Sequence, residues 1–185
     1  TNVSVTGTQA DKSSLTGASV SIEADAKEGI SSLLIAAAGA QTAAVSTSVN
    51  VNRQLSDVYA LVEHSELAGN YAQNSNYLGR ITTSAITATG ALYAAVPVSV
   101  VINYADNAVS SSLVHTLLNA EGKAASVVAK RTSELSSLNV TAGVAMDAAV
   151  AGLVNVNTVE GSTSSEVNDS EVKAGQFSIN AENED

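Results

Sequence analysis

Apolar and polar residues alternate in short stretches along much of the chain. A period of two places every second side chain on the same face of an extended strand. The clearest apolar pairs with this spacing are Val3/Val5, Val20/Ile22, Val49/Val51, Val100/Ile102, Val154/Val156 and Phe177/Ile179. Short clusters rich in Gly, Asn and Ser, such as 68–70 and 160–165, separate the alternating stretches and are typical of turns. The pattern predicts a protein built from many strands.

The chain also contains an internal repeat. The segments Ile30–Asn52, Ile81–Asn103 and Leu135–Asn157 align without gaps, and the first shares 12 of 23 residues with the third and 11 of 23 with the second. The copies are spaced by 51 and then 54 residues, so we expect the additional residues around Glu121–Ser126. Such self-similarity is typical of proteins in which repeated units stack on one another.

One part of the repeat, Leu33–Val45, also has helical features. Ala, Leu and Gln are good helix formers, and the apolar residues between Ile30 and Ala38 keep a helical spacing. The equivalent segment Ile81–Thr89 is rich in β-branched residues, and Pro97 follows in the same block. Both features disfavour a helix. Because homologous units share one structure, we expect strands throughout.

The predicted fold is all-β: a right-handed parallel β-helix, or solenoid, in which residues 1–185 form a single segment. We place the repeats at about 17–69, 70–120 and 121–174, with a partial next unit at 175–185, and expect a piece of a longer array. Coils of a β-helix have about 20–25 residues, so a repeat would supply two coils; one larger coil with long flat faces is the alternative. A β-propeller or sandwich is disfavoured because aromatic and Gly blade signatures are absent.

Two columns of the repeat carry specific structural predictions. The first column is apolar, is expected to point inward and be buried, and comprises Val51, Ile102 and Val156. The second column is expected at a repeated turn and comprises Asn52, Asn103 and Asn157. Asparagine tolerates left-handed turns, and its amide bonds neighbouring backbone. With two coils per repeat the amides would form an interrupted ladder, about 10 Å apart at twice the strand spacing.

Composition and charge exclude several classes of function. Eight Lys and Arg against 18 Asp and Glu give a formal net charge of −10, which argues against a nucleic-acid partner because too few cations oppose the phosphates. The apolar stretches are too short and too mixed to span a bilayer, so we expect no membrane insertion. The sequence contains no Cys, which removes disulfides, thiol nucleophiles and Cys-bound zinc. We expect no cofactor.

A carbohydrate-active β-helix enzyme is one alternative, since paired carboxylates on a groove can hydrolyse glycosidic bonds. The acidic residues are instead scattered over turn-like segments, and Lys130-Arg131 is the one basic pair. No G-x-S-x-G motif is present either, and this motif marks the serine nucleophile of many hydrolases. We therefore expect a protein that is not an enzyme and has no catalytic or metal-ligating residues.

Tyrosines and histidines are the remaining candidates for a binding surface. Tyr71 and Tyr77 border a polar segment and would offer a stacking surface to a glycan, the alternative being that they cover the hydrophobic edges of coils. A third column lies 12 residues after the repeat asparagines and comprises His64, His115 and Asp169. Imidazoles titrate near neutrality and ligate metals. At a separation of about 10 Å, however, they could not share an ion, so we expect an exposed polar position.

The repeat resembles units of large bacterial exoproteins. Its Ala/Gly/Val-rich block ends in Ser48–Asn52 and continues through Tyr59–Glu63 to Ser65–Asn70. A similar frame recurs at Leu153–Asn157, whereas Tyr104–Ala120 in the second unit lacks the Gly turn. The similar proteins are filamentous-hemagglutinin-like adhesins and leukotoxin-like repeat proteins of anaerobes, exported by two-partner secretion or as autotransporter passengers. The resemblance implies a right-handed β-helical shaft at the cell surface, active in adhesion or host interaction.

The repeat and this resemblance together favour a structural and adhesive function. We expect a stalk segment of a secreted or cell-surface bacterial protein, with a host-cell or glycan receptor as its partner. A self-assembling extracellular filament subunit is an alternative, because the open end of a solenoid can pair with the next copy end to end. The carbohydrate-active enzyme is the weaker alternative.

Overall fold

Strands form nearly the whole protein. The computed structural model describes residues 1–185 and contains no helix, which confirms the strand prediction for Leu33–Val45. The strands are β1 (Asn2–Thr6), β2 (Ser13–Ala40), β3 (Ala43–Glu63), β4 (Ser65–Ala91), β5 (Ala94–Val114), β6 (Leu117–Val144), β7 (Ala148–Ala149), β8 (Gly152–Asn168) and β9 (Glu171–Glu184). The structure contains no apolar helix of membrane-spanning length.

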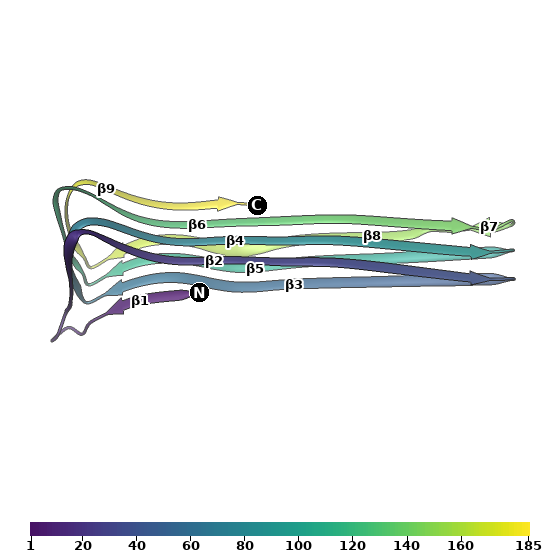
Figure 1. The fold of residues 1–185 in the computed structure, drawn as a ribbon, viewed down its shortest axis with the longest axis horizontal. Coiled ribbons are helices and arrows are strands. Elements are labelled where there is room, and N and C mark those ends of the chain that lie inside the picture. The colour runs from purple at the N-terminus through teal and green to yellow at the C-terminus, as the bar shows by residue number, and fades with distance from the viewer.

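The strands form two parallel sheets, to which β1 to β6 belong alternately, while β7 and β8 both belong to the first sheet and β9 to the second. One sheet has the order β1-β3-β5-β7, with β8 also pairing β5, and the other has the order β2-β4-β6-β9. All neighbouring strands in both sheets are parallel. The long strands run side by side along the longest axis, with tight turns at both ends (Figure 1). The sheets face one another, because Ser48 Oγ of β3 lies 2.6 Å from Thr87 Oγ1 of β4.

The sequence repeat and the sheet register coincide. Ile30 pairs with Ile81, and Ile81 pairs with Leu135, so residues 51 and then 54 positions apart are hydrogen-bonded neighbours. The additional residues lie between Asn119 and Ala125, where the register of β6 shifts against β4, close to the predicted position. Each repeat therefore contributes one long strand to each sheet. The expectation of two short coils per repeat is wrong, and the larger unit with long flat faces describes the repeat.

The hydrophobic core lies in the half of the molecule next to the turns that follow β3 and β5. It contains the ends of β3 and β5 and the beginnings of β4 and β6, including Val58, Val62, Leu67, Leu113 and Leu118. These side chains are almost completely buried. In the other half of the molecule, the space between the sheets is lined largely by Ser, Thr and Asn side chains.

The inward orientation predicted for the apolar column is wrong. Val51, Ile102 and Val156 do pair with one another in register, but Val51 is 62% exposed, Val156 is 43% exposed and Ile102 is half-buried. The reason is the strict alternation along one uninterrupted strand. Val58 and Val62 of β3 point inward, so the residues at even positions of that strand, Asn52 among them, point inward as well.

The repeat asparagines lie in the middle of strands β3, β5 and β8, so the predicted turn position is wrong. The predicted interrupted ladder, with amides about 10 Å apart, is wrong as well, because the amides are in direct contact and form a continuous ladder. Asn52 Nδ2 donates to Asn103 Oδ1 at 2.8 Å, and Asn103 Nδ2 donates to Asn157 Oδ1 at 2.8 Å. Thr83 Oγ1 of the facing sheet donates to Asn103 Oδ1 at 2.8 Å. Asn52 and Asn103 are buried, whereas Asn157 is exposed on the outermost strand.

Candidate functional site

The two tyrosines expected at a ligand surface lie inside the protein. Tyr71 is 3% exposed and Tyr77 is 2% exposed, and both belong to the hydrophobic core. Tyr71, Tyr77 and Leu67 all occupy odd positions of β4, whose side chains point inward. The position in the strand therefore decides their orientation, and the polar neighbours in sequence do not. Tyr71 donates a hydrogen bond to Gln73. Burial raises the pKa of both phenols, and Glu28 adds to the effect at Tyr77.

The third column of the repeat forms a stack of turns at one end of the molecule. His64 is the single residue between β3 and β4, whereas His115 and Asp169 are each the first of two residues between strands, and their φ angles are 48°, 48° and 45°. Few residue types adopt this left-handed conformation, and Asn, Asp and His are enriched among those that do. The local sequence therefore fits the turn, and the predicted column is confirmed as a set of equivalent positions.

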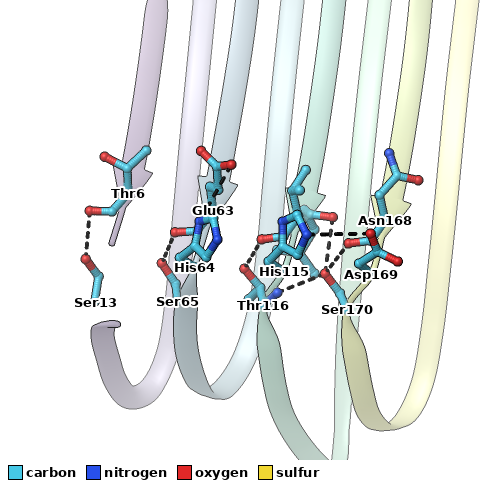
Figure 2. A network of polar contacts seen from close by, with 12 residues as sticks. Thr6, Ser13, Glu63, His64, Ser65, His115, Thr116, Asn168, Asp169 and Ser170 are labelled. Carbon is cyan, nitrogen blue, oxygen red and sulfur yellow. Dashed lines mark hydrogen bonds and ion pairs between the residues drawn. The ribbon is translucent and has the colours of Figure 1, made fainter. Parts of the chain in front are cut away.

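A hydroxyl residue closes each of these turns in the same way. Ser65 Oγ donates to the Glu63 carbonyl at 2.9 Å, and Thr116 Oγ1 donates to the Val114 carbonyl at 2.9 Å. Ser170 Oγ repeats the bond to the carbonyl of Asn168 at 2.8 Å. These equivalent contacts are visible in Figure 2. They fix each turn locally.

Backbone hydrogen bonds join one turn to the next. The His64 amide donates to the Val114 carbonyl at 3.1 Å, and the His115 amide donates to the Asn168 carbonyl at 3.0 Å. Consecutive turns are therefore spaced like neighbouring strands, about 4.8 Å apart. The expected separation of about 10 Å is wrong, because it assumed two coils per repeat.

The two imidazole rings stack face to face along this column. Their centroids lie 4.8 Å apart and their planes differ by 10°. The side chain of His64 is 23% exposed and that of His115 is 48% exposed. The ring of His115 is therefore more open to solvent than the ring of His64.

Two carboxylates lie beside the stacked rings (Figure 2). Glu63 Oε1 lies 3.6 Å from His64 Nδ1, and Asp169 Oδ2 lies 3.5 Å from His115 Nε2. One ligand atom from each of Glu63, His64 and His115 lies within 4.8 Å of the other two. The turn thus gathers two nitrogen donors and a carboxylate at one place, with a second carboxylate next to it.

Sequence reasoning missed Glu63 as a member of this group. It is the last residue of β3 and directly precedes His64, so the available signal was the Glu-His pair at the end of a predicted strand. The more important obstacle was distance: the column could be identified from spacing alone, but the separation between its members depended on how many strands a repeat contains.

A second polar group lies between the sheets, around Arg131 of β6. Its side chain is 3% exposed and its Nη2 lies 2.8 Å from Asp185 Oδ2. Arg131 Nη1 donates to the Glu160 carbonyl at 2.7 Å, and Nε donates to Asn183 Oδ1 at 2.8 Å. These contacts occupy the guanidinium with fixed partners and tie β8 and β9 to β6, so we assign this group to the stability of the fold.

Comparisons with protein-family models, curated proteins and solved structures found no match for this chain.

Proposed function

We propose that the chain is a segment of a flattened, right-handed β-solenoid that acts as a rigid scaffold in a secreted or cell-surface bacterial protein. In this role the protein spaces or presents binding elements for attachment to a host cell or a glycan. The observation that carries the proposal is the unbroken parallel register of the repeats: β3 pairs with β5 at every position from Ala43 to Glu63. A load applied to one repeat is shared with its neighbours through that ladder.

Side-chain contacts between repeats support the same role. Arg80 Nη2 lies 2.6 Å from Glu134 Oε2, and Lys130 Nζ lies 3.3 Å from Glu182 Oε1. Both ion pairs join paired positions of adjacent strands. These charged side chains connect one repeat to the next on the surface, as the asparagine ladder does in the interior.

The shape of the chain in solution tests the scaffold proposal. Extended strands rise about 3.3 Å per residue, so the 28 residues of β2 span about 90 Å. Small-angle X-ray scattering of the purified chain should give a flat particle with a maximum dimension near that length. A scattering profile typical of a flexible coil would contradict a rigid scaffold.

Binding assays test the adhesive part of the proposal. We expect the labelled chain to bind saturably to host epithelial cells or to members of a glycan array. The same samples should release no new reducing ends from a panel of soluble polysaccharides. Release of reducing ends would favour the carbohydrate-active alternative.

End-to-end self-assembly is a second candidate function, and the outermost strand of the second sheet favours it. Phe177 and Ile179 of β9 pair with the inward-facing Ala125 and Val127 of β6. They extend the inner face of that sheet, yet they are 39% and 48% exposed. The free edge of β9 also presents unpaired backbone groups, which favour pairing with another chain.

Charge placed on this edge tests the second candidate. If copies associate end to end, the double variant Phe177→Lys, Ile179→Lys should reduce the sedimentation coefficient of assembled material to that of a monomer. Ser178→Lys adds charge to the same strand on its other face and serves as the matched control. A monomeric unmodified chain at high concentration would rule out a filament subunit.

A further inference from the structure

We propose that Glu63, His64 and His115 form a binding site for one borderline divalent transition-metal ion, for which Zn²⁺ is the representative probe. The three residues contribute ligand atoms that lie within 4.8 Å of one another. They come from two successive turns at the same end of the molecule (Figure 2). The site is a property of this turn and adds a binding activity to the scaffold.

The donor atoms define the class of ion. Two imidazole nitrogens with one carboxylate oxygen form a ligand set that is common for zinc. Imidazole suits Zn²⁺, Cu²⁺ and Ni²⁺, whereas Ca²⁺ and Mg²⁺ prefer sites made of oxygen ligands. The chain has no Cys, so thiolate ligation plays no part. The site should therefore discriminate strongly against Ca²⁺ and Mg²⁺.

The geometry needs only a small adjustment to bind an ion. In a tetrahedral site with bonds of about 2.1 Å, two ligand atoms lie about 3.4 Å apart. Glu63 Oε1 and His64 Nδ1 are already 3.6 Å apart. The third donor, on His115, lies within 4.8 Å of the other two and has to approach by up to about 1.4 Å. Rotation of the half-exposed His115 ring out of its parallel stack provides that movement without a change in the backbone.

The backbone at the site is already ordered. The bonds from Ser65 and Thr116 hold the two turns, and the His64 amide is bonded to the Val114 carbonyl of the next repeat. Only the rotamers of three side chains remain to be fixed when the ion binds. Such preorganisation lowers the entropy that binding must overcome.

Asp169 acts as a positioning residue in this arrangement. Its Oδ2 lies 3.5 Å from His115 Nε2. Metal-ligating histidines commonly donate their second ring N–H to a carboxylate, which fixes the ring orientation and raises the basicity of the ligand. We therefore assign Nδ1 of His115 to the ion and Nε2–H to Asp169.

Isothermal titration of the full chain with ZnCl₂ tests the proposal, with variants that preserve the turn. Asn adopts the left-handed conformation readily, so His64→Asn and His115→Asn remove the imidazole while keeping the backbone. Glu63→Gln removes the carboxylate. Glu66→Gln is the matched control, because Glu66 is a nearby exposed acid that faces Lys12 instead.

We expect one Zn²⁺ per chain, an affinity at least about tenfold weaker in each histidine variant and in Glu63→Gln, and an unchanged affinity in Glu66→Gln. Absence of saturable binding, equal binding of Ca²⁺, or unchanged binding in both histidine variants would overturn the proposal. An equal loss of Zn²⁺ affinity in Glu66→Gln and Glu63→Gln would show that the acidic residues act only through their negative charge, and that Glu63 is not a ligand.

Nuclear magnetic resonance of the unmodified chain provides a test that does not depend on variants folding. The imidazole resonances of His64 and His115 should shift together as Zn²⁺ is added and stop shifting at one equivalent. A shift of one histidine alone, or of neither, would exclude a shared ion.

Discussion

The side-chain amide of Asn52 donates to the side-chain oxygen of Asn103 at 2.8 Å, although 51 residues separate them in sequence. Asn103 in turn donates to Asn157 and accepts from Thr83 across the gap between the sheets. Its amide therefore links three successive repeats and both layers of the protein. Hydrogen bonds between equivalent asparagines, and from Thr83 of the facing sheet, therefore help to hold together the interior of this half, where polar side chains are frequent.

Replacing the central asparagine should destabilise the protein more than replacing the outermost one. Asn103→Ala leaves the buried amide of Asn52 with one bond fewer, and we expect a loss of about 2–3 kcal/mol in the free energy of unfolding. Asn157→Ala, on the exposed outer strand, should cost less than about 1 kcal/mol. Urea denaturation of the two variants measures the difference. Equal losses would contradict the ladder as a buried network.

Two valines of the same strand should respond differently to a polar substitution. Val62 is fully buried and Val51 is 62% exposed. Thr has nearly the shape of Val but adds a hydroxyl, so Val62→Thr should cost about 1–3 kcal/mol. Val51→Thr should change the free energy of unfolding by less than about 0.5 kcal/mol. Equilibrium unfolding in urea compares the two variants. A larger loss for Val51→Thr than for Val62→Thr would show that Val51 points into the interior.

Burial of two phenols makes stability depend on pH in the alkaline range. The raised pKa values of Tyr71 and Tyr77 mean that the folded protein favours the protonated phenols. Their contribution is therefore complete below the unfolded pKa of about 10 and is lost as the pH rises above it. The free energy of unfolding should fall above about pH 10. Absorbance at 295 nm should show that part of the tyrosine signal titrates late.

The double variant Tyr71→Phe, Tyr77→Phe should weaken that alkaline loss of stability, because it removes the two groups that ionise on unfolding. Tyr93→Phe is the matched control, since Tyr93 is 50% exposed. An alkaline slope that is the same in the double variant and the unmodified chain would show that other groups cause it.

The buried arginine should contribute far more to stability than an exposed arginine with a similar ion pair. Arg131→Ala removes a buried guanidinium and its three contacts, and because the Asp185 carboxylate is one-third exposed and stays hydrated, we expect a loss of about 1.5–3 kcal/mol. The side chain of Arg80 is 67% exposed although it lies 2.6 Å from Glu134, and Arg80→Ala should cost less than about 1 kcal/mol. Thermal and urea denaturation should agree on this order.

The sequence was sufficient to place residues side by side but not to decide which way they point. The columns that contain Val51 and Asn52 were aligned correctly because equivalent side chains stack in repeat proteins. Alternation defines two faces and leaves open which face is interior. The interior face of β3 is determined by Val58 and Val62, which lie further along the strand and are buried in the hydrophobic core.

The sequence likewise predicted only part of the candidate site. The repeat spacing brought His64, His115 and Asp169 into one column, and the left-handed turn suits all three residue types. The distance between the rings depended on whether a repeat forms one strand per sheet or two short coils. Composition gave no information on that choice, because both arrangements bury the same small side chains.

The length of the strands has a consequence for the shape of any larger assembly. A unit of about 51 residues lengthens the stack by only one strand spacing, about 4.8 Å. The growth axis therefore gains about 0.1 Å per residue, compared with 1.5 Å per residue for an α-helix. The width across the stack stays at about 90 Å however many units are added. Repeats of this kind build a wide plate rather than a thin shaft, and each added unit supplies two further long strips of outer surface.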